Sequence, residues 1–226
     1  MASVSIPPSL AGQRPMEDPL AHLPCSSIME FRRGQAIYSA DQPSTAIYLV
    51  IDGKVKVSRV ADDGRQIVVD IYQTDEFFGE SAFLSSLRRA EQAIALENTK
   101  LMTWTVMEIE DIMLRKPRLG VALTQILVQR TIDFTHRIES FSMDNIARRL
   151  ARSLIRFSER LGVPEEDGTV RMTPFTHELL SQYVGTSREI VTHYMNQFRR
   201  QGYLRYSRKA IILHRDSFKE WLRQDA

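Results

Sequence analysis

The chain has 226 residues, 43% of them hydrophobic and 26% charged, and its net charge of +2 is unevenly spread: residues 145–226 carry 15 Lys and Arg against 9 Asp and Glu. No apolar run approaches the roughly 20 residues of a membrane span, and the N-terminus lacks a signal-peptide core, so we expect a cytoplasmic protein without a membrane partner. Cys25 is the only cysteine, which excludes an internal disulfide and an iron–sulfur cluster with four thiolate ligands.

The N-terminal half begins with a proline-rich segment and continues as short β-prone runs. The first 25 residues contain five prolines and predict a flexible tail or an arm packed on the body. From Ile28 to about Met113, β-prone runs alternate with turn residues, which predicts an all-β domain. The sequence Asp62-Asp63-Gly64 lies between two alternating runs and predicts a hairpin turn.

A candidate binding segment runs from residue 77 to residue 101. A short helix that starts after Gly79 would present backbone N–H groups to an anion, and Arg89 could clamp a phosphate. A purely structural role is equally open. In that case Glu80 bonds backbone amides, and Arg89 bridges to a carboxylate inside the domain.

Residues 117–142 contain no proline or glycine after Gly120 and predict one long helix. Its apolar stripe repeats close to heptad spacing, which predicts packing against a second helix; packing on the β domain alone is the alternative. We expect a hinge at residues 140–144, with Asp144 capping a helix that begins at Asn145. The residues expected in the helix–helix contact are Leu123, Ile126, Leu127, Arg130, Phe134 and Ile138.

Residues 176–200 predict two short helices joined by a turn at Gly185, with Thr176 and Ser187 as the two N-caps. In the second helix one apolar face recurs at the helical period, and the polar residues therefore point outward. After Gly202, two short β-prone runs around a polar turn predict a hairpin wing. The apolar face comprises Val191, Tyr194, Met195 and Phe198, and the outward residues are Arg188, Glu189, Thr192, His193 and Asn196.

Two stretches resemble one known family. VGTSREIVTHYMNQFRRQGYL, residues 184–204, resembles the DNA-binding half of the cyclic-AMP receptor/fumarate-nitrate regulator (Crp/Fnr) superfamily of bacterial transcription regulators. GQAIYSADQPSTAIYLVIDGKVKV, residues 34–57, resembles the opening of that family's cyclic-nucleotide-binding β-roll. The resemblance covers nearly all of the chain after residue 25.

This resemblance implies an α+β fold in four parts: a flexible tail (1–25), an effector-sensing β-roll (26–116), a dimerisation helix (117–142) and a winged helix-turn-helix domain (143–226). It also implies a homodimer that binds double-stranded DNA at a palindrome with TGTGA-like half-sites and that has RNA polymerase as a partner. An effector sensed in the β-roll would be relayed through the long helix to the recognition helix.

The resemblance further assigns roles in DNA contact. Arg188 and Glu189 would read base edges in the major groove, since Arg can fork onto guanine and Glu can accept from the cytosine amino group. His193 would occupy the third reading position, where the cyclic-AMP receptor branch has arginine. The residues expected to contact DNA are Thr176, His177, Ser187, Arg188, Glu189, Thr192 and His193.

The effector site of the family matches this chain in part. Gly79, Glu80 and Arg89 agree with residues that hold the ribose and the cyclic phosphate, but Ala90 stands where the family has Ser or Thr. Losing that donor costs about 1.5–3 kcal/mol of binding. Phe134 and Thr135 fall near the positions that contact adenine. Cyclic AMP or another cyclic nucleotide is the candidate effector; a haem-bound gas, another effector or no effector at all stays open.

Two other classes of function compete with the regulator. A non-DNA cyclic-nucleotide-binding regulatory subunit would leave the helix-turn-helix unexplained. An enzyme has little support, because the five histidines show no metal-ligand spacing and the chain has no Gly-rich phosphate loop. We therefore expect neither a catalytic residue nor a metal site.

Overall fold

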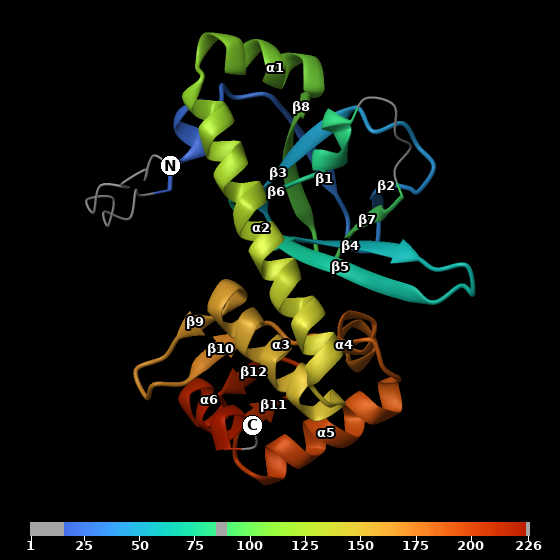
Figure 1. Ribbon diagram of the computed structural model, residues 1–226, viewed down its shortest axis with the longest axis vertical. Coiled ribbons are helices and arrows are strands. Elements are labelled where there is room, and N and C mark those ends of the chain that lie inside the picture. The colour runs from blue at the N-terminus through green and yellow to red at the C-terminus, as the bar shows by residue number, and fades with distance from the viewer. Residues whose placement is uncertain (1–15, 85–89, 225–226) are drawn as a thin grey trace, which may run out of the picture.

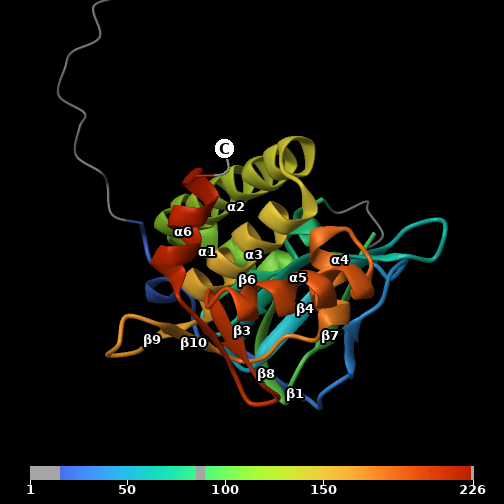
Figure 2. The same ribbon diagram turned by 90° about the horizontal axis from the view of Figure 1, so that it is seen from below.

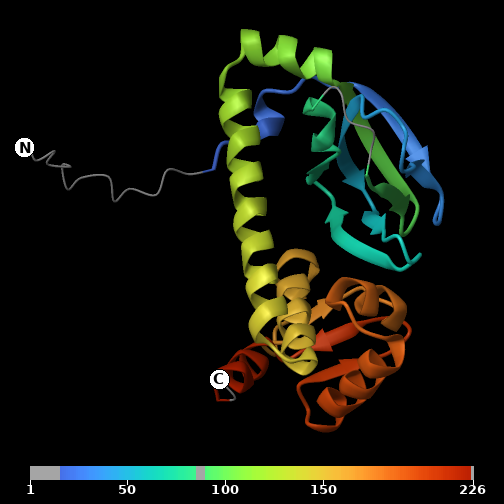
Figure 3. The same cartoon turned by 45° about the vertical axis from the view of Figure 1, so that its right-hand side comes forward.

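The computed structural model describes residues 16–84 and 90–224 (Figure 1). In chain order they form a β-roll, the long helix α2 (Arg118–Met143) and a C-terminal domain of helices with a small sheet. Helix α2 runs along the roll and reaches the C-terminal domain with its last turns (Figures 1 and 3). The α+β class predicted from the sequence is confirmed. Within the described residues, no helix is both long and apolar enough to cross a membrane.

Residues 16–25 lie against the body of the protein. The Glu17 amide donates to Gln125 Oε1 at 2.7 Å, and the Glu17 carboxylate pairs with Arg118 at 3.1 Å. The Trp104 indole donates to the Pro24 carbonyl at 3.2 Å. For this segment, which includes the short 3-10 helix η1 (Pro19–Ala21), a packed arm thus replaces the flexible tail.

The β-roll consists of two four-stranded antiparallel sheets, with strand orders β1-β8-β3-β6 and β2-β7-β4-β5. Val50, Val55, Leu101 and other fully buried residues fill the space between them. The hairpin predicted at Asp62-Asp63-Gly64 is confirmed. The strands are β1 (Ser27–Phe31), β2 (Ala36–Tyr38), β3 (Ala46–Asp52), β4 (Lys54–Val60), β5 (Gln66–Gln73), β6 (Phe77–Phe78), β7 (Gln92–Ala95) and β8 (Thr99–Thr105).

The β-rhythm ends earlier than predicted, because residues 106–115 form a helix, α1 (Val106–Arg115). A capping box starts it: Thr105 Oγ1 accepts from the Glu108 amide at 3.2 Å, and the Glu108 carboxylate accepts from the Thr105 amide at 2.7 Å. Ile109 and Ile112 are buried in the cluster that joins α1 and α2 to the roll. The Thr-x-x-Glu spacing of residues 105–108 is the sequence signal for the start of this helix.

The predicted hinge at residues 140–144 is mostly helical, since α2 continues to Met143. Asn145, not Asp144, caps the next helix, α3 (Ile146–Leu161), because its side chain accepts from the Arg148 amide at 3.0 Å. Asp144 instead accepts from Ser140 Oγ at 2.6 Å and pairs with Arg148 and Arg152 at 3.2 and 2.7 Å. The break between α2 and α3 is therefore limited to two residues and held by ion pairs.

The C-terminal domain places four helices around a sheet of order β11-β12-β10-β9. The helix-turn-helix and the wing hairpin β11–β12 appear where the sequence predicted them, and the last helix was not predicted. The elements after α3 are β9 (Val163–Pro164), β10 (Val170–Met172), α4 (His177–Val184), α5 (Arg188–Arg200), β11 (Leu204–Tyr206), β12 (Ile211–Leu213) and α6 (Arg215–Gln224).

Strand β5 belongs to both halves of the molecule. Val68 and Ile71 are fully buried in the hydrophobic core of the C-terminal domain, while Tyr72 is buried in the core of the roll. Helix α4 packs directly on β5. The two domains therefore share one strand. We call this strand, together with the arginines of α2 and α3 that contact it, the β5 joint.

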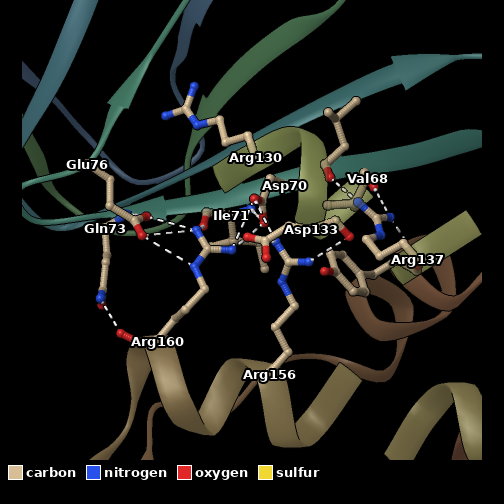
Figure 4. A network of polar contacts seen from close by, with 12 residues as sticks. Val68, Asp70, Ile71, Gln73, Glu76, Arg130, Asp133, Arg137, Arg156 and Arg160 are labelled. Atoms are coloured by element: carbon tan, nitrogen blue, oxygen red, sulfur yellow. Dashed lines mark hydrogen bonds and ion pairs between the residues drawn. The ribbon is translucent and has the colours of Figure 1, made fainter. Parts of the chain in front are cut away.

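Arginines from α2 and α3 converge on the β5 joint (Figure 4). Arg160 contacts the carboxylate of Asp70 at 2.8 and 3.0 Å and that of Glu76 at 3.0 Å. Arg156 pairs with Asp133 at 3.1 Å and approaches Asp70 at 3.6 Å. Asp70 is only 3% exposed, so its charge depends on these partners for compensation.

Arg137 of α2 completes the joint. Its guanidinium donates to the carbonyls of Val68 and Val69 in β5, and it stacks over the ring of Tyr183 in α4 at 4.2 Å from the centroid. One side chain thus connects the long helix, the roll and the helix-turn-helix.

Candidate nucleic-acid interface and effector pocket

The geometry of the helix-turn-helix follows from three local residues. Thr176 Oγ1 accepts from the Leu179 amide at 3.1 Å, and Ser187 Oγ accepts from the Ile190 amide at 3.3 Å, so both predicted N-caps are confirmed. Gly185 has φ 75°, where other residues are strained, and a side chain there would approach the Phe141 ring at 3.0 Å. These contacts fix the angle at which α5 leaves the turn.

Helix α5 divides into a buried and an open face, as predicted. Val191, Met195 and Phe198 are at most 1% exposed. Arg188, Glu189 and His193 are exposed, whereas Thr192 and Asn196 are half-buried. The helix lies on the side of the C-terminal domain away from the roll (Figures 1 and 2). Its first turn is therefore open to solvent at Arg188 and Glu189.

Five of the seven residues expected to contact DNA come from the starts of two adjacent helices. Thr176 and His177 begin α4, while Ser187, Arg188 and Glu189 begin α5. His177 and Thr192 are joined by a 2.8 Å contact, so these sets lie side by side. Thr192 and His193 are one turn further along α5, and His193 contacts the ring of Tyr194 edge-on at 5.2 Å.

The charges at the start of α5 suit base recognition. The backbone amide of Glu189 itself and the Ser187 hydroxyl lower the pKa of the Glu189 carboxyl, so it is ionised at neutral pH. An ionised carboxylate accepts hydrogen bonds only, as a cytosine amino group requires. Arg188 beside it supplies donors. The pair can therefore distinguish bases by donor and acceptor pattern.

A second layer of contacts behind α5 was not foreseen from the sequence. The Tyr206 hydroxyl of the wing donates to Asn196 Oδ1 at 3.1 Å, and the Arg199 guanidinium lies 5.4 Å from the Tyr206 ring centroid. His177 meets the Tyr206 ring edge-on at 5.5 Å. The sequence does not predict these contacts, because no short-range spacing relates Tyr206 of the wing to Asn196 and Arg199 of α5.

The wing adds exposed positive charge beside α5. Arg205, Arg208 and Lys209 are exposed, and the Ser207 hydroxyl holds the turn by accepting from the Lys209 amide at 3.1 Å. Together with Arg199 and Arg200 at the end of α5, these residues form a basic surface. Such a surface attracts a phosphate backbone independently of sequence.

The effector pocket expected in the roll lies at the β6–α2 contact. Gly79 has φ 88°, and a Cβ there would meet the Ala46 carbonyl at 2.9 Å and the Tyr48 ring at 3.1 Å. The 3-10 helix η2 (Glu80–Phe83) follows, as predicted. Glycine is therefore required here by the backbone and by the neighbouring strand.

Glu80 has a partner from the long helix. Its carboxylate pairs with Arg130 at 2.9 Å, and the same guanidinium donates to the Phe77 carbonyl and lies 4.9 Å from the Tyr72 ring centroid. Burial opposes the charge on Arg130, but Tyr72 and Glu80 outweigh it and raise its pKa. Arg130, expected in the helix–helix contact, therefore faces the roll instead.

The other expected effector residues are less closely gathered. Arg89 lies outside the described residues, and Ala90 is exposed. Thr135 is exposed and its hydroxyl donates to the Thr131 carbonyl at 3.0 Å, while Phe134 is half-buried. A cavity beside both Glu80 and Arg130 measures about 20 Å³, room for about one water molecule, and a larger one of about 410 Å³ borders Arg130, Tyr72 and Asp133.

No group of three or more His, Cys, Asp or Glu residues in the described ranges could hold a metal ion.

Comparisons with known proteins agree on both halves. A cyclic nucleotide-binding domain matches residues 28–116, and a Crp-like helix-turn-helix domain matches residues 148–221. The chain is 25% identical over 186 residues, 82% of this chain and 83% of the relative, to a CRP-like cAMP-activated global transcriptional regulator of Mycobacterium tuberculosis. It is 29% identical over 179 residues, 78% and 84% of the two chains, to the transcriptional regulator SdrP of Thermus thermophilus.

Among solved structures, FixK2 from Bradyrhizobium japonicum superposes with a TM-score of 0.76 at 20% identity, covering 86% of this chain and 96% of that one. The cyclic nucleotide-binding domain precedes the Crp-like helix-turn-helix domain in the chain, and the Mycobacterium relative matches a length that includes parts of both. The chain belongs to the Crp/Fnr superfamily and is a transcription regulator of that type.

Proposed function

We propose that this regulator is a homodimer that reads a palindromic site through the first turn of α5. The observation that carries the proposal is the exposed Arg188–Glu189 pair, held by the Ser187 cap on a helix whose other face is buried. Thr176, Ser187 and His177 would approach phosphates, Thr192 and His193 would complete the contact, and the wing would meet the backbone. Selection of sites from random duplexes tests this: TGTGA-like half-sites are expected, and a pool without enrichment would contradict it.

The dimer proposal rests on the outer face of α2. Positions 121, 124, 128, 131, 135 and 138 follow heptad spacing and carry Val, Thr or Ile. Val121, Val128 and Ile138 are 53%, 54% and 65% exposed in the single chain.

The three threonines of this seam, Thr124, Thr131 and Thr135, donate their hydroxyls to carbonyls one turn earlier at 2.8, 2.9 and 3.0 Å. Their methyl groups can then face a second helix without an unpaired donor.

This seam differs in part from the predicted one. Leu123 is buried against the roll and Ile126 packs on the same cluster, so neither is open to a second chain. Leu127 and Ile138 are exposed. The predicted stripe therefore mixed two faces of α2, because a helix with apolar residues on both sides gives no sequence signal for which side meets which partner.

Val128→Asp is expected to shift the protein from dimer to monomer, because two carboxylates would meet at the seam in a low-dielectric contact. Sedimentation equilibrium would show the change. Leu114→Asp is the matched control, since Leu114 is 83% exposed on α1, away from the seam, and it should leave the mass unchanged. A dimer that survives Val128→Asp at micromolar concentration would contradict the seam.

The effector proposal is a cyclic nucleotide held at Gly79, Glu80 and Arg89, with α2 closing the site. The match of a cyclic nucleotide-binding domain to residues 28–116 and the relative named as cAMP-activated support it. The ligand would have to share Glu80 with Arg130. RNA polymerase is the proposed protein partner, and the cytoplasm the proposed location, because the relatives are transcription regulators.

A second candidate is a regulator of the same family that needs no effector. The Arg130–Glu80 pair and Ala90 in place of a hydroxyl residue favour it. DNA binding that is equal with and without cyclic nucleotides would support this candidate over the first.

Ala90→Ser is expected to tighten cyclic-AMP binding tenfold or more, because it restores a donor to a charged phosphate worth about 1.5–3 kcal/mol. Isothermal titration calorimetry would measure the change. Ala40→Ser, at another exposed alanine of the roll, is the control. Equal affinities for the two variants would place the phosphate elsewhere.

A further inference from the structure

The start of α4 is tied to the middle of α5 through one histidine. His177 Nδ1 lies 2.8 Å from the Thr192 hydroxyl oxygen, and the ring also meets Tyr206 of the wing edge-on at 5.5 Å. His177 therefore contacts the recognition helix and the wing at once, and it sits beside the exposed residues at the start of α5.

The hydrogen bonds determine which ring nitrogen carries the proton. Thr192 has one hydroxyl proton, which it donates to the Arg188 carbonyl at 2.8 Å. The Thr192 oxygen must then accept from His177, so the neutral ring is protonated on Nδ1. Its Nε2 is left with a lone pair, and nothing in the described parts of the chain is bonded to it. The His177 side chain is only half-buried, so the Nε2 lone pair is not a buried polar group that lacks a hydrogen bond.

The surroundings of the ring keep it neutral in the free protein. Burial and the nearby charge of Arg188 lower the pKa of His177 below its ordinary value. The groups that face the ring from other elements are Thr192 and Arg188 of α5 and Tyr206 of β11, and only Arg188 among them is charged at neutral pH. With Nδ1 donating to Thr192, Nε2 is an acceptor, and a phosphate oxygen is also an acceptor, so the two can bond without loss of the Thr192 contacts only when the ring gains a proton.

We propose that His177 is a proton-linked phosphate contact: when duplex DNA docks on α5, a phosphate oxygen reaches Nε2, and the ring takes up one proton from solvent and donates it to that oxygen. The inference rests on the proposed DNA interface. The phosphate also offsets the repulsion from Arg188, so protonation is easier in the complex than in the free protein. The added affinity is complete below the free-state pKa and is lost as the pH rises through the pKa in the complex.

Fluorescence anisotropy with a labelled duplex, at constant ionic strength, tests the linkage. As the pH rises from below the free-state pKa of His177 to about pH 8, the affinity of the wild type should fall by about tenfold per subunit, which corresponds to a pKa difference of about one between the two states. His177→Gln keeps a donor without titrating and should remove most of this pH dependence. His136→Gln, at an exposed histidine of α2 outside the proposed DNA contact, is the matched control and should keep it.

Thr192→Val supplies a readout that a purely structural role would not give. Without the hydroxyl acceptor, the neutral ring can carry its proton on Nε2, so affinity at about pH 8 should rise relative to the wild type and the pH dependence should shrink. A wild type without pH dependence, or a dependence that survives in His177→Gln, would overturn the proposal. Failure of the wild type to bind any duplex at any pH would instead contradict the DNA interface itself.

Discussion

Arg188→Ala is expected to remove most of the preference for the selected palindrome over random duplex while leaving salt-sensitive binding in place. Arg188 is exposed at the first turn of α5, and nothing else at that position offers a forked donor for guanine. A bidentate contact contributes about 1–3 kcal/mol of discrimination, or roughly ten- to hundredfold in each half-site. Since a dimer would lose the contact twice, competition binding with specific and random duplexes should show a loss of about a hundredfold or more.

Arg200→Ala is the matched control for this experiment. Arg200 is exposed at the opposite end of the same helix, where a contact with the phosphate backbone is expected. Its loss should weaken binding to both duplexes alike and reduce the dependence of affinity on salt concentration by about one charge per subunit. If the two variants lose specificity to the same extent, the assignment of Arg188 as a base reader is wrong.

Asp70→Ala is expected to lower the free energy of unfolding by about 3–5 kcal/mol, because it leaves the arginines of the β5 joint without their buried counter-charge. Asp70 is 3% exposed and is contacted by Arg160 at 2.8 Å. Chemical denaturation followed by circular dichroism would measure the loss. Glu159→Ala is the control on the same helix as Arg160, since the Glu159–Lys219 pair is 45% and 40% exposed and should matter by less than about 1 kcal/mol.

The paired variant Asp70→Leu with Arg160→Leu separates charge from packing. Each single change to leucine removes the shortest ion pair of the remaining charge, whereas the double change removes both members of that pair, so the double variant should be more stable than the sum of the single losses predicts. Additive losses would mean that Asp70 and Arg160 are not coupled, and the ion pairs would then contribute little to holding the domains together.

The sequence predicted those parts of the molecule whose signals are local. The two N-caps at Thr176 and Ser187, the turn at Gly185 and the buried face of α5 follow from spacings of a few residues, and all are confirmed. Helix α1 was not predicted, because β-prone runs were expected as far as Met113, although the capping box of Thr105 and Glu108 is a local signal for it. Helix α6 was not predicted either.

Contacts between distant segments could not be predicted in the same way. Asp70 and Arg160 are 90 positions apart in the sequence. His177 and Thr192 lie on α4 and α5, and the sequence does not specify the angle between these two helices. The same limit explains why Arg130 was assigned to a helix–helix contact, although its charge is matched by Glu80 of the roll. Such pairings depend on how whole helices and strands pack against one another. The pattern of polar and apolar residues along a single sequence does not specify that packing.

The strand shared by both cores restricts how this protein could be recombined. A chimera that joined residues 1–144 to the DNA-binding half of another regulator would bring foreign side chains against Val68, Ile71 and the buried carboxylate of Asp70. Unless that half supplied arginines matching Arg156 and Arg160, the graft would trap an uncompensated charge at its seam. The boundary visible in the sequence is therefore not a place where the molecule can be cut and exchanged freely.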